Sequence, residues 1–499
     1  MHTTLINPPQ AFSKSMVTAC VTPPLGVAYL AAVAIEAGHK VKLIEALGEA
    51  PREVTEYRNG LSLRGLNFRE IIKEIPKETD LVGISNLFTF AFPVVLDLAK
   101  TIKEERDVPI VLGGAHPSAT PHETLKHDEI DYVIISEGED TLIDLLSVLE
   151  GKKKEAELDG FAWKEKGSVK VNPKTKLIEN LDSIPFPRRD LLPMENYFST
   201  KEAHGPVQDR WTPMLTSRGC PYECTFCTPR LWLRKYRLRG VENVVNEIEE
   251  CISDFKIREF LFEDENLTIN KKRTLDLCNE IKKRKLDITW QTPNGIRASV
   301  TDEEMLVKMK ESGCSHITVA PESGSERILN NVIRKHQNLE DVTRVVRTAN
   351  KMGLKCAAFF IMGLPGENID DLEKTIAYST RLAKEGLDEV AFAPFIPVPG
   401  SELYDKLKAD KKLDYKDYKF EDLTVMGDLN KTASWSEHIS NEQLQRYRRK
   451  AYVKFHIARA VYHPGNTFRS MMNVLRGRQE TKTERVIQTF LKRYSKKQG

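Results

Sequence analysis

Three cysteines stand close together in the segment GCPYECTFC, as Cys220, Cys224 and Cys227. With this spacing, one tight loop after a strand can direct three thiolates at a cubane iron–sulfur cluster. The remaining iron then has no protein ligand and can bind a small molecule. A zinc site would ordinarily need another Cys or His at comparable spacing, and the nearest histidine, His204, lies upstream, before a predicted strand. The pattern therefore favours an open iron–sulfur cluster over zinc.

The residues around the triplet, SRGCPYECTFC with the aromatic Phe226 before the last cysteine, resemble the signature of the radical S-adenosylmethionine superfamily. The resemblance implies that Cys220, Cys224 and Cys227 are the metal ligands of a catalytic 4Fe-4S cluster and that Phe226 lies at the cofactor. It also implies that the open iron chelates S-adenosylmethionine, whose reductive cleavage gives a 5'-deoxyadenosyl radical. An electron donor of the flavodoxin or ferredoxin type would be a partner.

Later segments resemble the family's contacts to the coenzyme, each at the end of a predicted strand. In LFEDENLT a carboxylate would suit the coenzyme's ammonium group, and we favour Asp264 over Glu263 and Glu265. NGIRAS and APESGSE would hold the ribose and carboxylate, and the glycines of FFIMGLPGE would let the backbone approach the adenine. The implied coenzyme-binding residues are Asp264, Asn294, Arg297, Glu322, Ser323 and Gly363.

The same residues also have plainer interpretations, which the sequence leaves open. Asp264 or one of its neighbours could belong to a solvated loop or cap a helix. Arg297 could make a paired contact to the coenzyme carboxylate, or be an exposed arginine with Glu322 as its partner inside the barrel.

The chain from Thr3 to about Leu149 alternates β-rich runs with helical ones, which predicts a parallel, doubly wound sheet. The β-rich runs are TTLINPP, KVKLIEAL, DLVGISN, VPIVLGG and DYVIISEGE, and a helix is expected in LGVAYLAAVAIEAG. In such sheets a ligand lies beyond the carboxyl ends of the strands. The candidate binding residues at these ends are Pro8, Ser85, Gly113, Gly114, His116 and Gly138.

Four segments ahead of the cysteine triplet resemble the cobalamin-binding domain of many radical S-adenosylmethionine methyltransferases and cyclases. In chain order they are NPP, PPLGVAYLAA, GGAHPSATP and DYVIISEGE. The Asp-x-His-x-x-Gly loop that supplies a histidine to cobalt in other cobalamin proteins is missing, so we infer a corrin without a protein histidine on the metal. His116 is the strongest alternative ligand by position, although a turn or a contact to the cofactor tail is favoured. Cys20 could approach the same face, but a buried structural cysteine is favoured.

Residues 151–192 turn polar and pass through DSIPFPRRDLLP, which cannot form a central strand or a regular helix. A second alternating series follows, and it predicts a partial (β/α)6 barrel of the TIM type. Its strands are expected near Met214–Arg218, Glu259–Glu263, Ile288–Thr292, Ile317–Pro321, Ala357–Met362 and Glu389–Pro394.

The expected fold is therefore α/β in three parts. Residues 1–185 would form a Rossmann-like cobalamin-binding domain with its linker, and residues 186–412 the radical S-adenosylmethionine core. Residues 413–499 would form a mainly helical, basic appendage.

The composition excludes several classes of protein. A formal charge of +3 over 499 residues favours neither a nucleic-acid nor a membrane partner for the chain as a whole. No apolar run approaches the roughly 20 residues of a membrane helix, and no signal peptide is evident, so we expect a cytoplasmic protein. Five other cysteines are expected to be buried small hydrophobes rather than ligands: Cys20, Cys251, Cys278, Cys314 and Cys356.

The tail is the exception to neutral charge, with 15 Lys and Arg against 3 Asp and Glu between Asn441 and Gly499. In TERVIQTFLKRYSKK, one helical face is apolar and basic residues lie elsewhere. The apolar residues are Val486, Ile487, Phe490, Leu491 and Tyr494, and the basic residues are Arg485, Lys492, Arg493, Lys496 and Lys497. We favour a helix packed on the barrel with a solvated basic face. The alternative is an interfacial helix that docks on anionic membrane, which would suit a hydrophobic or lipid-like small-molecule substrate.

With both cofactors, the simplest function is methyl transfer to an unactivated carbon. The resemblance implies that the deoxyadenosyl radical removes a hydrogen atom and that the substrate radical takes a methyl group from methylcobalamin. The main rival is a radical oxidative cyclase or ring-rearranging enzyme of the tetrapyrrole or hopanoid and lipid type. A non-catalytic cobalamin-binding scaffold, acting as a sensor or carrier, is the alternative from another class of function.

Overall fold

The first sheet is built from β-rich runs that return to it through helical crossovers, which makes neighbouring strands parallel. The structure is a computed structural model that describes residues 1–13, 20–58, 60–413, 415 and 432–495. The strand order in this sheet is β10-β9-β8-β7-β6-β1-β3. The parallel strands are β1 (His2–Asn7), β3 (Lys40–Glu45), β6 (Leu81–Ser85), β7 (Ile110–Gly113) and β8 (Tyr132–Ile134). The predicted doubly wound sheet is confirmed.

Helices cover both faces of this sheet. On one face α1 (Leu25–Glu36) packs with α7 (Glu139–Leu149), and on the other α3 (Phe68–Glu74) packs with α4 (Phe92–Glu105). Leu5 belongs to the first of these two cores and its neighbour Ile6 to the second, as the alternation of side chains along a strand requires. Short helices follow two of the strands: α2 (Ala46–Glu49), α5 (Ala115–Ala119) and α6 (Pro121–Thr124).

Two β elements were not predicted from the sequence. The hairpin of β9 (Phe161–Glu165) and β10 (Ser168–Asn172) lies in the polar segment before the Pro-rich linker and extends the first sheet in the antiparallel sense. A small antiparallel sheet joins β2 (Gln10–Ser13), β5 (Leu61–Arg64) and β4 (Val54–Glu56). β4 is exposed at every residue and β10 is nowhere fully buried, so neither carries the apolar pattern that marks a core strand.

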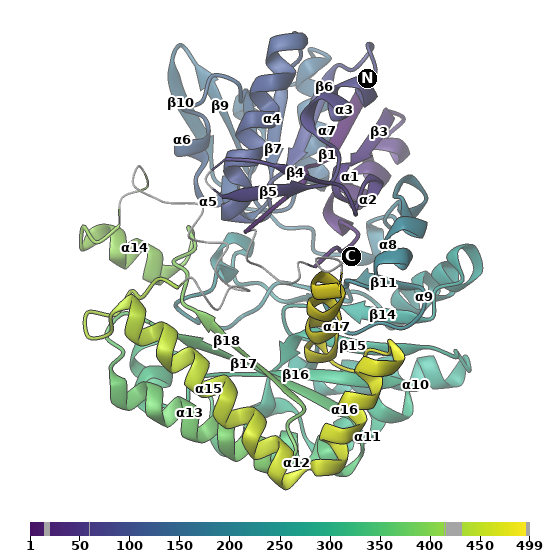
Figure 1. The fold of residues 1–499 in the computed structure, drawn as a ribbon. Coiled ribbons are helices and arrows are strands. Elements are labelled where there is room, and N and C mark those ends of the chain that lie inside the picture. Colours follow the sequence, from purple (N-terminus) through teal and green to yellow (C-terminus); the bar gives the residue numbers. More distant parts are fainter. Residues whose placement is uncertain (14–19, 59, 414, 416–431, 496–499) are drawn as a thin grey trace.

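Below this domain, a second sheet is curved around its own core (Figure 1). Its strands follow the sequence, in the order β11-β14-β15-β16-β17-β18, and all neighbours are parallel. The strands are β11 (Trp211–Met214), β14 (Glu259–Phe262), β15 (Thr289–Ile296), β16 (Cys314–Glu322), β17 (Lys355–Met362) and β18 (Glu389–Pro394). The helices between them are α9 (Val241–Phe255), α10 (Lys271–Lys283), α11 (Glu303–Glu311), α12 (Leu339–Lys351) and α13 (Ile369–Lys384). The predicted partial (β/α)6 barrel is confirmed.

The first barrel strand was predicted too far along the chain. Instead of one strand near Met214–Arg218, β11 ends at Met214 and a separate strand, β12 (Ser217–Arg218), pairs with β13 (Arg237–Leu238) in an antiparallel hairpin. The chain turns at Leu215 and Thr216 because Thr216 and Ser217 bond the buried carboxylate of Asp264 rather than the neighbouring strand.

The linker is attached to the barrel through buried charge. Arg189 forms an ion pair with Glu247 of α9 at 2.7 Å, and Glu247 also pairs with Arg239, which follows β13. After the linker, α8 (Met194–Thr200) leads into β11. The Pro-rich segment is thus held against the barrel although it contains no strand.

The described part of the C-terminal appendage is helical, as predicted. It contains α15 (Asn441–Tyr462), α16 (Pro464–Arg476) and α17 (Lys482–Ser495), and α14 (Glu402–Ala409) precedes it. α15 packs against α13 and β18 through one face that includes Leu444, Ala451 and Phe455.

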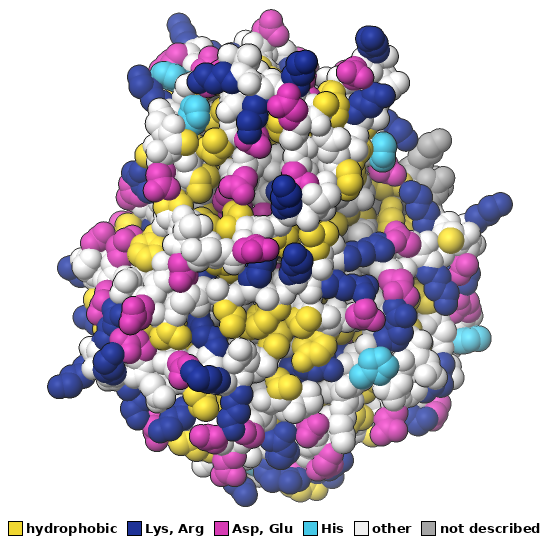
Figure 2. All heavy atoms as spheres, turned by 180° about the vertical axis from the view of Figure 1, so that it is seen from behind, with side chains coloured by type: hydrophobic (Ala, Val, Ile, Leu, Met, Phe, Trp, Pro, Cys, Tyr) yellow, Lys and Arg dark blue, Asp and Glu magenta, His cyan; other side chains and the backbone are white. Residues whose placement is uncertain are grey.

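Two surface properties bear on function. None of the described helices is both long enough and apolar enough to span a bilayer. On the face opposite to that of Figure 1, acidic and basic side chains are intermixed around a central apolar area, so this face carries no field of a single sign (Figure 2).

Candidate active site

Cys220, Cys224 and Cys227 lie on one loop, between β12 and the 3-10 turn Pro229–Trp232. The loop is anchored on the barrel, because Thr225 donates its N–H to Ile333 at 3.0 Å and its hydroxyl to Val332 at 2.6 Å. A tight turn within it joins the Cys227 N–H to the Cys224 carbonyl at 3.1 Å. All three thiols are therefore presented from one braced segment.

Gly219 sets the direction of this loop. Its φ of +84° lies in the left-handed region, and a Cβ there would stand 2.0 Å from the carbonyl oxygen of Lys235. Lys235 belongs to the returning arm that leads to β13, so only glycine lets the two arms of the hairpin approach each other at this point.

The chemistry of the donor set fits an iron–sulfur cluster. Desolvation raises the pKa of all three thiols, that of Cys227 to about 12, although part of its surface is open to solvent. The thiols are therefore neutral until a metal displaces their protons. Among the described residues, no three Cys, His, Asp or Glu side chains converge as a single metal ion would need. Three thiols on one loop suit a cubane, in which each would bind a different iron.

Arg297 and Glu322 meet the cysteine loop from the carboxyl ends of β15 and β16. The Arg297 guanidinium stacks on Tyr222, between the first two cysteines, at 3.7 Å from the ring centroid, and its Nη2 donates to the Lys335 carbonyl at 2.6 Å. Lys335 in turn donates Nζ to Glu322 at 2.6 Å. The partner of Glu322 is thus Lys335, and the interpretation that paired it with Arg297 is not what the structure shows.

Glu322 also has an unusual backbone. It is buried and has a φ of +65°, a conformation that non-glycine residues seldom adopt. Burial raises the pKa of its carboxyl group, while the charge of Lys335 opposes the rise. Strained residues of this kind cluster at functional sites.

The three acidic residues after β14 have separate contacts. Asp264 is buried and accepts hydrogen bonds from the Thr216 N–H and hydroxyl and from the Ser217 hydroxyl. Glu263 pairs with His204 at 3.0 Å, and Glu265 accepts the Gly219 N–H at 3.1 Å.

Asp264 and Glu265 therefore brace the start of the cysteine loop. Asn294, exposed at the end of β15, donates to the Glu263 carbonyl at 2.8 Å. Direct binding of the coenzyme by Asp264 or Asn294 stays a prediction.

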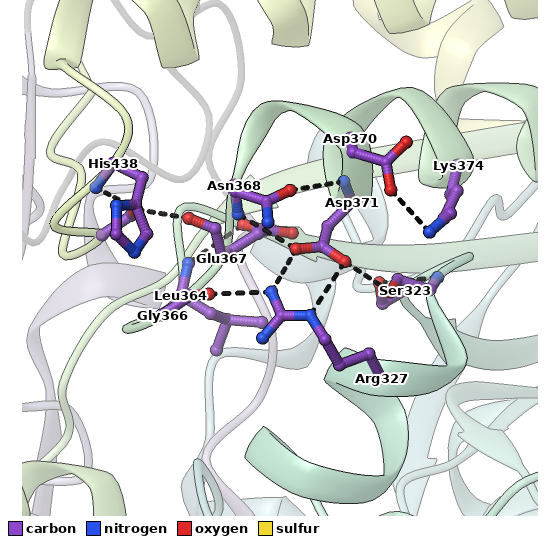
Figure 3. Close-up of polar contacts among 12 residues, drawn as sticks. Ser323, Arg327, Leu364, Gly366, Glu367, Asn368, Asp370, Asp371, Lys374 and His438 are labelled. Carbon is purple, nitrogen blue, oxygen red and sulfur yellow. Dashed lines mark hydrogen bonds and ion pairs between the residues drawn. The ribbon is translucent and has the colours of Figure 1, made fainter.

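Ser323 and Gly363 lie where their strands meet helices. The Ser323 hydroxyl is buried and lies 3.1 Å from that of Thr375 in α13. Figure 3 shows this region, with Arg327 directed at Asp371 near the start of the helix.

Gly363 has a φ of +84°, and a Cβ there would stand 2.5 Å from Leu444 of α15. Ser323 and Gly363 thus each contact a helix, and their approach to the coenzyme stays a prediction.

The loops of the first domain bring its candidate residues together at one edge of the sheet. Pro8 follows β1, Ser85 ends β6 and Gly113 ends β7, while Gly114 packs so closely that a Cβ would stand 2.6 Å from the Asn86 carbonyl oxygen. Beyond Asn86, the neighbouring Leu87 and Phe88 are exposed. Sequence reasoning missed this pair, although two apolar residues directly after a strand end could have signalled an apolar platform.

His116 is placed away from solvent. Its Nδ1 lies 3.3 Å from the Thr89 hydroxyl, and its Nε2 lies 3.2 Å from the Tyr415 hydroxyl and 3.4 Å from that of Thr120. Desolvation lowers the pKa of His116 to about 3, so the ring is neutral at physiological pH. Both ring nitrogens are engaged, which fits the inference that no histidine of this loop reaches cobalt.

The segment around Gly138 contacts the barrel. Gly138 caps α7, and the residues on either side, Glu137 and Glu139, pair with Arg218 and Arg237 of the β12–β13 hairpin. We call these four side chains the interdomain clamp. Arg237 donates to both oxygens of Glu137, at 2.6 and 2.9 Å, and Arg218 lies 2.7 Å from Glu139.

All four side chains of the clamp are between 2% and 14% exposed. Burial by itself would raise the pKa of Glu139, but the charge and hydrogen bond of Arg218 hold the pKa below its usual value. Within the clamp, Glu139 and Arg218 thus stay ionised inside the protein. Nothing local in the sequence reveals such a contact.

Two family models match the chain. The model of the radical SAM superfamily matches residues 214–378, and that of the B12 binding domain matches residues 17–146. The first range contains the cysteine loop with Arg297 and Glu322. The second contains Ser85, Gly113 and His116, while Pro8 lies ahead of it.

The chain is similar to whole proteins as well as to these models. It is 33% identical to the uncharacterized methyltransferase PH0819 of Pyrococcus horikoshii over 465 residues, 92% of this chain and 93% of the relative. It is 32% identical to the cytidylyl-2-hydroxyethylphosphonate methyltransferase of Streptomyces wedmorensis over 436 residues, 80% of each chain.

A solved structure shares the fold. The radical S-adenosylmethionine methyltransferase TsrM of Kitasatospora setae, with cobalamin and a [4Fe-4S] cluster bound, superposes with a TM-score of 0.63. The identity is 17%, over 82% of this chain and 75% of TsrM.

Gly219→Ala should lose most of the cluster iron while keeping all three cysteines, because the added Cβ collides with the Lys235 carbonyl and twists the loop. Iron content after anaerobic reconstitution measures the effect. Gly353→Ala is the matched control, since Gly353 also has a positive φ but open space around its Cβ position. Equal iron in the two variants would contradict the role given to Gly219.

Glu137→Ala should lower the free energy of unfolding by about 3–5 kcal/mol, because Arg218 and Arg237 are left buried without their shared carboxylate. Chemical denaturation measures it. Glu78→Ala, which removes an exposed carboxylate, should cost less than about 1 kcal/mol.

The pH dependence of the clamp has a definite sign. The pKa of Glu139 is lowered in the folded state, so its stabilising effect is complete at neutral pH and is lost as the pH falls below the ordinary range of a glutamate and through that lowered pKa. If the Glu137→Ala and Glu78→Ala variants had equal free energies of unfolding, the clamp would not be a stabilising contact.

Proposed function

The chain belongs to the radical S-adenosylmethionine superfamily and carries its B12 binding domain, and from this premise we propose that it methylates an unactivated carbon of a small molecule. Both relatives described above are named as methyltransferases, and they match over most of their length. These names support methyl transfer. They do not extend to the substrate of this chain.

The residues present fit both cofactors. When bound, the 4Fe-4S cluster with S-adenosylmethionine supplies hydrogen-atom abstraction, and cobalamin supplies the methyl group. We assign Cys220, Cys224 and Cys227 to the cluster, on the chemistry of the loop. We assign the edge formed by Pro8, Ser85, Gly113 and Gly114, together with the exposed Leu87 and Phe88, to the corrin, because small residues and an apolar surface suit a broad flat ring.

One observation carries the proposal: ion pairs join the cysteine loop to the sheet edge that we assign to cobalamin. Arg218 stands two positions before Cys220 and pairs with Glu137 and Glu139, which follow β8 at the carboxyl edge of the first sheet. The interdomain clamp thus fixes the cysteine loop against the edge proposed for cobalamin. A substrate held between them would meet both cofactors in one fixed geometry.

Arg297 is proposed to hold the coenzyme carboxylate, but by a single contact. Its Nε donates to Ser299 and its Nη2 to the carbonyls of Lys335 and His336. Among the described residues, Nη1 has no hydrogen-bond partner, so it is the nitrogen available to a ligand. A paired contact would require one of these internal hydrogen bonds to break.

The partners follow from the same site. We propose a small-molecule substrate, and an electron donor of the flavodoxin or ferredoxin type that approaches the cluster where Cys227 is open to solvent. We also retain the division of the chain after residues 185 and 412 as a proposal. Each of the two family matches falls inside one of the resulting domains.

Product analysis tests the proposed reaction. Any substrate that raises 5'-deoxyadenosine above background in the reconstituted, reduced protein should raise S-adenosylhomocysteine by an equal amount, because each methyl group comes from a second S-adenosylmethionine. Liquid chromatography with mass spectrometry measures both. Substrate-dependent 5'-deoxyadenosine without S-adenosylhomocysteine would support the ring-forming alternative instead.

The control for this experiment is the Cys220→Ala, Cys224→Ala, Cys227→Ala variant. It should contain no cluster iron and form neither product, yet still bind cobalamin through the first domain. A triple variant that keeps full iron and cleaves the coenzyme would overturn the cluster assignment.

Cobalamin reconstituted into the protein should show no nitrogen coupling from a protein imidazole in the electron paramagnetic resonance spectrum of its reduced cobalt. The reason is that both nitrogens of His116 are engaged inside the first domain. His116→Ala should leave the cobalt spectrum unchanged, as should His127→Ala, which alters another histidine of the same domain. An imidazole coupling that disappears only in His116→Ala would disprove the absence of a histidine ligand.

A further inference from the structure

The last helix, α17, is oriented opposite to the favoured expectation. Its polar residues Glu484, Arg485 and Gln488 are buried, whereas Val486, Ile487, Phe490 and Leu491 are 38% to 57% exposed. A surface helix ordinarily buries its apolar stripe. The prediction of a helix packed on the barrel with a solvated basic face is therefore wrong for these residues, because Arg485 is buried and the apolar side is exposed. The side chains of Lys492, Arg493 and Tyr494, and all of Lys496 and Lys497, lie outside the described residues.

Polar contacts hold α17 in this orientation. Arg485 donates to the Ala203 carbonyl, Glu484 accepts from Asn473 of α16 at 3.3 Å, and Gln488 donates to the Arg478 carbonyl at 2.7 Å. At the start of the helix, the Lys482 N–H donates to Glu389 of β18 at 2.7 Å. The attachment of α17 to the barrel thus does not use its apolar side.

The two preceding helices expose apolar stripes as well. In α15, Val453, Ile457 and Val461 recur every fourth residue on the side opposite to the one packed on α13. In α16, the exposed apolar residues are Phe468, Met471 and Leu475, and the only buried residue is Asn473.

These stripes contain most of the exposed large hydrophobic residues of the described chain. Of 15 exposed large hydrophobic residues, 11 lie on the last three helices. α16 contacts both α15 and α17, and all three lie on the face turned to the viewer in Figure 1. A concentration of this kind marks an interaction surface rather than the scattered apolar residues of an ordinary surface.

The charge around these stripes indicates the occupant. From Asn441 to Ser495 the sequence has 13 Lys and Arg against 3 Asp and Glu. Exposed basic residues flank the apolar positions, among them Arg446, Lys454, Arg469, Arg476 and Arg478. A second copy of the chain would bring the same positive charge against itself, so the surface is better matched to an anionic partner.

We propose that the exposed sides of α15, α16 and α17 dock on the surface of a bilayer that contains anionic phospholipid. The helices lie in the plane of the interface, with the apolar stripes in the headgroup and acyl boundary and the basic residues among the phosphates. No described helix could span the bilayer, so the contact is peripheral. The proposal goes beyond the proposed methyl transfer and does not depend on it.

Flotation with vesicles of phosphatidylcholine and phosphatidylglycerol tests the docking of the full-length, cluster-loaded protein. Binding should require phosphatidylglycerol and weaken with added salt. Phe468→Ser, Leu475→Ser should bind at least tenfold more weakly, whereas Val54→Ser, which alters another exposed apolar residue in the first domain, should bind as the parent does. Truncation before Thr481 is a poorer test, because it removes the contacts of α17 with Glu389 and Ala203.

A second pair of variants separates charge from apolar contact. Lys454→Gln, Arg476→Gln should weaken binding by at least tenfold, since each basic residue near an anionic surface contributes about fivefold. Lys126→Gln, Lys272→Gln removes the same charge elsewhere on the surface and should change little. Iron content and circular dichroism confirm that each variant is folded.

Three outcomes would overturn the proposal. One is equal flotation with and without phosphatidylglycerol, and another is unchanged binding in both α15–α16 variants. The third is a parent protein that light scattering shows to be a dimer, that does not bind vesicles, and that Phe468→Ser, Leu475→Ser converts to a monomer. In that case the stripes form a subunit interface.

Discussion

The interdomain clamp is the contact on which the arrangement of the site depends. Glu137 and Glu139 extend from the carboxyl edge of the first sheet, and Arg218 and Arg237 stand on the two strands that frame the cysteine loop. Because these charges are shielded from water, each is tolerated only while its partners are in place. Buried ion pairs of this kind add little net stability compared with apolar packing, but they discriminate strongly against any other register of the two surfaces.

The cysteine loop is fixed on its remaining sides by neutral and charged contacts of the barrel. Asp264 holds Thr216 and Ser217, Glu265 holds Gly219, and the backbone at Val332 and Ile333 holds Thr225. These residues therefore position the loop. A catalytic cluster needs such support because its position relative to coenzyme and substrate must be accurate to a fraction of an ångström. Small displacements weaken catalysis severely.

The sequence was sufficient for the parts of the fold that depend on local patterns. Strand and helix alternation predicted both parallel sheets, and the cysteine spacing with its neighbours predicted the loop. The edge hairpin of β9 and β10 was missed because its residues are partly solvated and carry no apolar period.

Other errors came from contacts between distant residues. The ion pair of Glu322 with Lys335 and the ion pairs of the clamp join residues that only the folded chain brings together. No local sequence pattern encodes these contacts. The orientation of α17 was predicted wrongly because an amphipathic pattern shows that a helix has two faces, but not which of them meets the protein. In α17 the polar face forms hydrogen bonds with Ala203, Asn473 and Glu389, so the apolar face is exposed to solvent.

The clamp also affects how the protein is made. Glu137 and Arg237 are 100 residues apart in the sequence, and a ribosome that adds about 5–20 residues per second needs about 5–20 s to synthesise the chain between them. During that interval the first domain has left the ribosome with two acidic side chains that belong in its future interface. It can form its sheet, but it cannot close that edge, because the carboxylates must stay hydrated until the arginines arrive. We therefore expect the nascent first domain to hold an open, water-filled edge until the hairpin that carries the cysteines emerges.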